Sequence, residues 1–312
     1  MLSLQKNRKK MSRTLKILIV ALLTYVTGSS PAQAMAKSFE LPVVPDTLRE
    51  PSQRAAYVIE HYWDSLDFAA DSSAVDEPFV EQAFVDFLSV FPYASQSARE
   101  CAVSILAEKA SANIESYRII MSLAEKYLFG HDSPMASDDT YSLFLNEILK
   151  GSVYDEVHKI RYRAHQHAVS VNRPGTPATD FSFLTRDGAV MTLGQIGTDR
   201  DILLIFYDPD CDHCTEVLEA LANDEANSEI LYKTRVVAVY SGDDMELWQQ
   251  QSELLPQEWI VGYEDGTMQD NGMYVIRSLP ALYLLAPDGT VILKDATPQA
   301  VIDTLNSRQI LN

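Results

Sequence analysis

Two cysteines separated by two residues, in the sequence Cys211-Asp212-His213-Cys214, restrict the possible folds of this chain more than any other feature. The motif follows an uninterrupted apolar run, residues 202–207, and precedes a helix-like stretch from Thr215 to Ala222. A cysteine pair at such a junction between a strand and a helix can close a small disulfide that opens easily. The motif therefore predicts thiol–disulfide exchange at the end of a buried strand.

The N-terminal residues have the features of an export signal. Lysines and arginines within the first 16 residues precede an apolar segment, residues 17–26, and small residues then lead to the cleavage signal Ala32-Gln33-Ala34. The apolar segment is about half as long as the roughly 20 residues that cross a bilayer, which favours cleavage over an uncleaved anchor. We therefore expect residues 1–34 to be a signal peptide, and the mature protein to be periplasmic with no stable membrane span.

Charge and cysteine content exclude two classes of protein. The 312-residue chain has a formal net charge of −19, and a surface this acidic repels phosphate backbones, so we expect no nucleic-acid partner. Three cysteines are too few for a disulfide-rich scaffold. The third of them, Cys101, lies in a helical pattern, and we expect it to be a buried core residue. A resolving or partner-binding thiol is the alternative for Cys101.

Two domains are predicted, because the sequence pattern changes near residue 173. Residues 38–150 show helical periodicity without strand alternation, which predicts a bundle of about five helices. Residues 151–173 predict a final helix that runs into a linker, with His165 and His167 on its surface. The following Pro174-Gly175-Thr176-Pro177 marks the domain boundary.

Strand patterns alternate with helical ones in the remaining 174–312. Residues 202–207 and 235–240 read as buried parallel strands, with a helix after each. Residues 281–285 and 290–293 predict a hairpin around a Pro-Asp-Gly turn, followed by a closing helix. The second half is therefore predicted to place a β-α-β unit and a β-β-α unit on one sheet.

These motifs, in this order, resemble exported TlpA/ResA-like thiol–disulfide oxidoreductases, which have the thioredoxin fold. The matching pieces are residues 174–181, Asp187-Gly188 with Thr192-Leu193, the Cys211-x-x-Cys214 pair, Ser278-Leu279-Pro280 with the strand after it, and Asp288-Gly289. The resemblance implies an α/β thioredoxin-like domain over residues 174–312, with a central mixed sheet flanked by helices, behind a separate all-α N-terminal domain. That helical segment, through His61-Tyr62-Trp63-Asp64 and Tyr127-Leu128, resembles an uncharacterised domain often found ahead of such modules.

The resemblance also assigns roles near the cysteines. Pro280 matches a family proline that is cis and lies opposite the cysteine pair, so Leu279 is expected to offer its backbone for strand-like pairing with a substrate chain. A plain trans proline at a strand edge is the alternative. In thioredoxins a buried carboxylate usually stands six residues before the first cysteine, but here that position is Ile205. The usual proton acceptor for the second cysteine is therefore missing, unless Glu216, Glu219 or a water replaces it.

Within the motif we expect Cys211 to be the nucleophile, because unpaired N–H groups at the start of a helix favour a thiolate. Cys214, one turn further and more buried, would be the resolving thiol. His213 can stabilise a neighbouring thiolate and make the pair more oxidising. The acidic residues Asp208, Asp210 and Asp212 act in the opposite direction, so the direction of electron flow stays open.

Metal binding is the rival interpretation of the same residues. The spacing Asp208-x-Asp210-x-Asp212 with Glu219 is similar to a calcium loop, but it lacks the required glycine and follows a strand rather than a helix. Cys211 and Cys214 with a histidine could hold copper(I) or zinc, although no second cysteine pair exists.

The sequence as a whole predicts an exported thiol–disulfide oxidoreductase that exchanges disulfides with periplasmic proteins. We expect no cofactor beyond a redox-active disulfide between Cys211 and Cys214. The expected partners are protein thiol or disulfide substrates and a membrane electron donor or acceptor. Two alternatives remain: a partner-binding module that uses the thioredoxin fold as a scaffold, and a metallochaperone that uses the cysteine pair.

Overall fold

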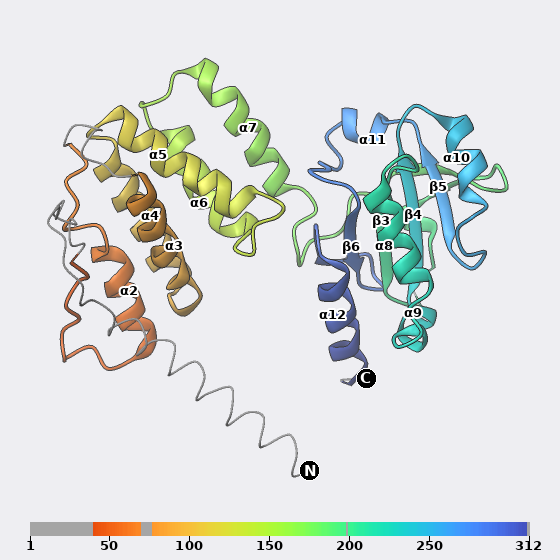
Figure 1. Ribbon diagram of the computed structural model, residues 1–312, viewed down its shortest axis with the longest axis horizontal. Helices are drawn as coiled ribbons and strands as arrows, with labels where there is room; N and C mark the ends of the chain where they lie inside the picture. Colours follow the sequence, from red (N-terminus) through yellow and green to blue (C-terminus); the bar gives the residue numbers. More distant parts are fainter. Residues whose placement is uncertain (1–39, 70–76, 198, 311–312) are drawn as a thin grey trace, which may run out of the picture. The chain divides into compact units, whose positions relative to one another are not determined.

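A computed structural model describes residues 40–69, 77–197 and 199–310 (Figure 1). The predicted signal peptide lies outside these residues. Leu41–Asn312 form one compact unit. We call its all-helical part, which ends at Ser170, the helical domain, and the part that contains the sheet, from residue 174 onward, the thioredoxin-like domain. None of the helices in the described ranges has the length and apolar character needed to cross a membrane.

Caps and aromatic packing define the helical domain. Its elements are α2 (Pro51–His61), α3 (Glu77–Ser89), the 3-10 turn η3 (Phe91–Tyr93), α4 (Gln96–Ala110), α5 (Ile114–Ala124), the π-helical turn η4 (Glu125–Phe129), α6 (Asp138–Lys150) and α7 (Glu156–Ser170). The side chains of Ser95, Asn113 and Ser137 accept hydrogen bonds from the first free N–H groups of α4, α5 and α6. Large buried aromatic residues, among them Phe84 and Phe144, fill the core between the helices.

The helix predicted within residues 151–173 is α7, which packs against α6 of the helical domain. Its residue His165 was predicted to lie on the surface, and this prediction is wrong. The imidazole is half-buried, its Nδ1 lies 2.9 Å from the Tyr141 hydroxyl, and the ring stacks on Phe129 with a centroid distance of 4.4 Å. His167, two residues further along, lies on a different face of the helix and is exposed.

The burial predicted for Cys101 is also wrong, because its side chain is exposed. The buried face of α4 is formed by Ala98, Ala102, Val103, Leu106, Ala107 and Ala110. Cys101 follows Ala98 by three residues, but α4 turns its neighbours Ala102 and Val103 into the core instead. In this alanine-rich helix the apolar positions are too evenly spread for periodicity to identify the inner face.

A seven-stranded mixed sheet forms the centre of the thioredoxin-like domain, in the order β2-β1-β5-β4-β3-β6-β7. The strands are β1 (Ser182–Thr185), β2 (Val190–Thr192), β3 (Ile202–Tyr207), β4 (Arg235–Ser241), β5 (Ile260–Glu264), β6 (Ala281–Leu285) and β7 (Val291–Leu293). Strands β3, β4 and β5 are parallel, whereas β1, β2, β6 and β7 pair antiparallel with their neighbours. The other elements are η5 (Leu193–Gln195), α8 (Asp212–Ala222), α9 (Ser228–Lys233), α10 (Met245–Ser252), α11 (Thr267–Asp270) and α12 (Pro298–Ile310).

Strand β3 positions the cysteine motif. All six of its residues are buried, and successive side chains point to opposite faces of the sheet. Leu203, Ile205 and Tyr207 belong to the core cluster that also contains Cys214 and Trp248. The alternate residues of β3 contribute to the cluster on the other face. Strand β3 is paired with β4 and β6 and is packed on both faces, so its end, where α8 follows, has a fixed position.

Candidate functional site

Cys211 caps the N-terminus of α8, the helix that follows β3. Its Sγ accepts a hydrogen bond from the Cys214 backbone N–H at 3.3 Å, and its own N–H donates to the Asp208 carbonyl at 3.1 Å. The side chain is half-buried, so a substrate sulfur can reach it. Free N–H groups and the helix dipole favour negative charge at this position. The local geometry therefore suits a thiolate nucleophile.

Cys214 lies one helical turn further and is fully buried, as the sequence predicts. Burial raises the pKa of its thiol to about 12, and the hydrogen bond with Cys211 contributes in the same direction. Cys211 and Cys214 are both free cysteines in the structure. The pair therefore combines one accessible sulfur with one that is shielded and held in its protonated form.

The floor beneath Cys214 is apolar. Ile205 is fully buried in the same cluster, at the position where the resemblance leads one to expect a carboxylate. Glu216 and Glu219 are exposed on α8, so neither replaces that carboxylate inside the protein. Asp208, directly after β3, acts on Cys214 in two ways: a hydrogen bond with its backbone lowers the pKa of this thiol, and the charge of its carboxylate raises that pKa by a smaller amount. The sequence did not single out Asp208 from the other acids, because only the turn after β3 brings it close.

His213, between the cysteines, is exposed in the first turn of α8. Its Nδ1 lies 3.8 Å from a Glu216 carboxylate oxygen, and among the described residues it forms no hydrogen bond with either cysteine. Any influence of His213 on a Cys211 thiolate would therefore act through space, at a site open to water.

The loop before β6 brings the predicted substrate-binding residues close to Cys211. The Leu279–Pro280 peptide bond is cis. Leu279 and Cys211 line the same cleft, which has a volume of about 460 Å³. We call it the sheet-edge cleft, because it lies where β3 and β4 end, next to Tyr207 and Ser241. The structure thus places Cys211 and Leu279 together, although they are far apart in the sequence.

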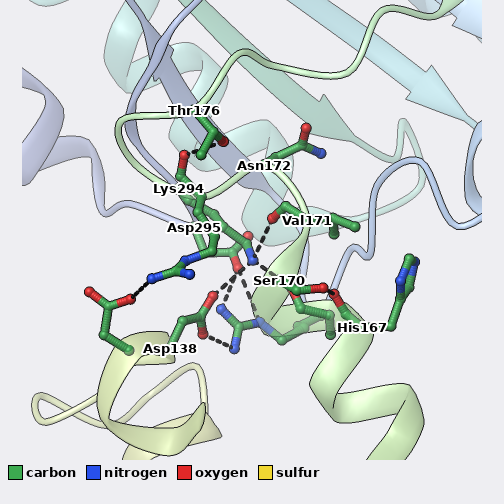
Figure 2. A network of polar contacts seen from close by, with 12 residues as sticks. Asp138, His167, Ser170, Val171, Asn172, Thr176, Lys294 and Asp295 are labelled. Atoms are coloured by element: carbon green, nitrogen blue, oxygen red, sulfur yellow. Dashed lines mark hydrogen bonds and ion pairs between the residues drawn. The ribbon is translucent and has the colours of Figure 1, made fainter.

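A partly buried ion-pair network beside this loop was not predicted (Figure 2). Arg277 donates from Nη1 to Asp138 at 2.9 Å and from Nη2 to Asp295 at 2.5 Å. Lys294, whose side chain is only 4% exposed, contacts Asp138 at 2.8 Å and the carbonyls of Ala168 and Val171. The members come from distant parts of the chain and follow no motif, so the sequence carries no signal that would have found them. We call these four charged residues the interdomain network, because Asp138 begins α6 of the helical domain.

Metal ligands are not gathered at this site. In the described ranges no group of three or more histidine, cysteine or acidic side chains could hold a metal ion. The aspartates of the calcium-like spacing have local structural roles. Asp208 Oδ1 accepts a hydrogen bond from the Asp210 backbone N–H, and Asp212 lies in the first turn of α8.

Comparison with known proteins identifies the helical half of the chain. Residues 3–172 match the family model described as a domain of unknown function, DUF5106. The chain belongs to this family. This match agrees with the predicted resemblance to an uncharacterised domain ahead of a thioredoxin module. No curated protein matches the chain.

Solved structures resemble both halves of this DUF5106 protein. A thioredoxin-like protein from Bacteroides caccae is 31% identical, with a TM-score of 0.80 over 88% of this chain and 99% of that one. A conserved protein of unknown function from Bacteroides fragilis is 33% identical over 43% of this chain and 98% of that one, with a TM-score of 0.40. The thioredoxin domain of a thiol-disulfide oxidoreductase from Bacteroides vulgatus is 16% identical over 43% of this chain and 96% of that one, with a TM-score of 0.36. The first match confirms the predicted fold class, a thioredoxin-like domain behind a helical one.

Proposed function

We propose that this protein is a thiol–disulfide oxidoreductase that uses Cys211 and Cys214 to exchange disulfides with other proteins. One observation carries the proposal: an accessible cysteine caps a helix, and its partner lies buried one turn further along. The cleft beside Cys211, shared with Leu279, supplies the space for a visiting disulfide.

In the reducing direction the Cys211 thiolate attacks one sulfur of a substrate disulfide. The S–S bond of the substrate breaks, a mixed disulfide forms on Cys211, and the departing substrate thiolate takes a proton. Cys214 then loses its proton and attacks the Cys211 sulfur, which releases the second substrate thiol. Two electrons pass to the substrate, and the Cys211–Cys214 pair is left as a disulfide. The reverse sequence would oxidise a dithiol substrate.

The proposal also includes the cellular compartment of the protein and its redox partners. The basic and apolar residues followed by Ala32-Gln33-Ala34 support export by a cleavable signal peptide to the periplasm. Thiol–disulfide chemistry suits that compartment, since disulfides persist there. A membrane electron donor or acceptor would return the cysteine pair to its working state, and no other cofactor is required.

Reduction of a protein disulfide by the purified chain tests the activity, with dithiothreitol supplying the electrons. Cys211→Ser should reduce the rate to that of dithiothreitol alone, because the attacking sulfur is gone. In a separate reaction without dithiothreitol, Cys214→Ala that has been reduced beforehand should accumulate the mixed disulfide on Cys211, which mass spectrometry of the intact protein detects. Cys101→Ser is the matched control and should keep full activity, since Cys101 lies on α4. Full activity in Cys211→Ser would refute the proposal, and partner capture by that variant would favour a scaffold role.

A further inference from the structure

The loop that contains Leu279 separates two clefts rather than bordering one. Arg277, Ser278 and Leu279 line the sheet-edge cleft on one side. The same three residues line a second cleft, of about 410 Å³, on the other side. Both volumes are in the range of cavities that bind ligands. Cys211 borders the first cleft and His213 the second, so the two clefts meet at the cysteine motif.

The second cleft has walls from both domains, and we call it the interdomain cleft. One wall consists of His213, Val217 and the 277–282 segment of the thioredoxin-like domain. The opposite wall consists of Phe129 and loop residues of the helical domain, among them His131 and Ala136. The thioredoxin fold alone would leave this side of the cysteine motif open, and here the helical domain closes it.

The interdomain network holds the two walls in place. Asp138 stands at the first turn of α6, at the end of the helical-domain loop, and it contacts both Arg277 and Lys294. Arg277 lies two residues before Leu279, and its guanidinium also packs over the Phe129 ring at 4.7 Å from the centroid. The charges of this partly buried network are paired at 2.5–2.9 Å, and separating them would cost free energy, so the network favours a cleft of fixed width.

The loop between the clefts offers free backbone groups to an occupant. Within the described chain, residues 275–279 form no backbone–backbone hydrogen bonds. Residues 275–279 are partly buried, and backbone N–H and C=O groups that have no partner within the chain are paired most readily by another extended polypeptide. A low-molecular-mass disulfide at Cys211 would occupy part of the sheet-edge cleft but would leave the interdomain cleft empty.

We infer that the helical domain supplies one wall of an elongated substrate cleft, and that this cleft selects an extended polypeptide segment around the reacting cysteine over a small disulfide. The segment would pair with residues 275–279, place its sulfur above Cys211 and extend into the interdomain cleft. This inference rests on the proposed exchange activity and adds a substrate class to it.

Two substrates that contain the same activated disulfide bond, one a peptide and one a small molecule, test this inference. One is an unstructured peptide of about 10 residues, roughly 33 Å when extended, whose central cysteine carries a thionitrobenzoate leaving group. The other is N-acetylcysteine amide with the same leaving group. The coloured thiol released by Cys211 gives a second-order rate constant for each. The wild-type protein should react about tenfold or more faster with the peptide, which corresponds to about 1.4 kcal/mol of additional transition-state stabilisation.

Variants that narrow the interdomain cleft should reduce this preference. Ala136 is exposed and lines the cleft, so Ala136→Trp should slow the peptide reaction about tenfold more than the reaction of the small disulfide. His131→Trp narrows the same wall from a second position and should have the same effect. Ala112→Trp is the matched control, in an exposed turn of the same domain that lines neither cleft, and should keep both wild-type rates.

The outcomes separate the inference from the proposed function. A wild-type protein that reacts with neither substrate would refute the exchange activity itself. Equal wild-type rates for the peptide and the small disulfide would refute the selectivity that we infer for the cleft, without refuting the exchange activity. An equal loss of both rates in Ala136→Trp and His131→Trp would have the same meaning. A loss of the peptide rate alone, in either variant with the unfolding temperature of the wild type, would support the inferred selectivity.

Discussion

At the scale of single residues, Cys214 and Ile205 together determine which step of the proposed exchange should be difficult. The Cys214 thiol lies on an apolar floor, and its burial raises its pKa to about 12. Only the thiolate attacks a disulfide, so at neutral pH very few molecules are ready for the second step. Cys211, in contrast, is only half-buried, so an incoming disulfide can reach its sulfur.

We therefore predict that resolution of the mixed disulfide becomes about tenfold faster with each pH unit from about pH 7 to about pH 9, without a plateau. The sign follows from the raised pKa, since the thiolate fraction of Cys214 increases with pH throughout that interval. Rapid acid quenching and chromatography of the mixed disulfide would measure its decay. A plateau below about pH 8 would show that a base not identified in the structure removes the proton.

A pair of aspartate variants probes the same step. Asp208→Asn would remove the charge that raises the pKa of Cys214 and keep the backbone hydrogen bond that lowers it, so resolution at fixed pH should become modestly faster, by about twofold. Asp210→Asn, two residues further along, should have a smaller effect. Slower resolution in Asp208→Asn would show instead that this carboxylate accepts the proton.

The cysteine pair and the missing carboxylate at Ile205 could be read from the sequence, because both depend on local spacing. Arg277, Asp138 and Lys294 could not, since their roles exist only when distant segments meet. Cys101 was misplaced for a different reason: small residues on several faces of α4 leave its inner side undefined.

At the scale of elements, β5 shows where pattern recognition fails. The buried strands β3 and β4 were predicted from long apolar runs, but β5 contains a glycine, which weakens a strand pattern. The structure explains this glycine: a Cβ at Gly262 would lie 2.5 Å from the ring of Phe183 on the neighbouring β1. Gly262 therefore weakens the strand pattern of β5 in the sequence but allows Phe183 of β1 to pack closely against β5.

Gly262→Ala should therefore destabilise the protein by about 1–3 kcal/mol through overpacking. Urea unfolding followed by circular dichroism would measure the loss. Gly197→Ala is the matched control, because a Cβ there would meet nothing closer than 3.6 Å, and it should change stability far less. An equal loss in both variants would attribute the effect to glycine flexibility rather than to contact with Phe183.

Helix α7 provides a second prediction at this scale, through His165. Burial, together with the positive charges of Arg161 and Arg277, lowers the pKa of His165 to about 4. The unfolded chain therefore binds more protons than the folded one between about pH 6.5 and about pH 4. The stability contributed by neutral His165 is complete above about pH 6.5 and is lost as pH falls towards about 4.

We expect His165→Gln to remove about 2 kcal/mol of the loss in unfolding free energy that the wild type shows between about pH 7 and about pH 4.5. Urea titrations at the two pH values would give the difference. Between about pH 7 and about pH 8 the two proteins should behave alike, because His165 is neutral in both states there. If the variant loses as much unfolding free energy at low pH as the wild type, protonation of His165 is not the cause of that loss.

At the scale of the whole molecule, negative charge gathers at the edge of the sheet that carries the cysteines. Strands β3, β4 and β5 are parallel, so their carboxyl ends share one edge. Each is followed by acid residues, Asp208, Asp243 and Asp265 being the first aspartates after the three strands. In the part of the chain that the structure describes, none of these three forms an ion pair. The whole chain also has a formal net charge of −19. We therefore expect this edge to attract positively charged segments of a substrate polypeptide.

A peptide substrate with lysines beside its cysteine should therefore react faster than one with glutamates, and added salt should reduce the difference. We expect about a tenfold advantage at low ionic strength, with most of it lost at about 0.5 M salt, where the screening length is only a few ångströms. Second-order rate constants across a salt series would measure this. Asp210→Asn should weaken the advantage, whereas Glu253→Gln, at the far end of α10, should leave it unchanged because α10 runs away from this edge. If both peptides respond to salt alike, the acidic edge keeps the protein soluble but does not select its substrates.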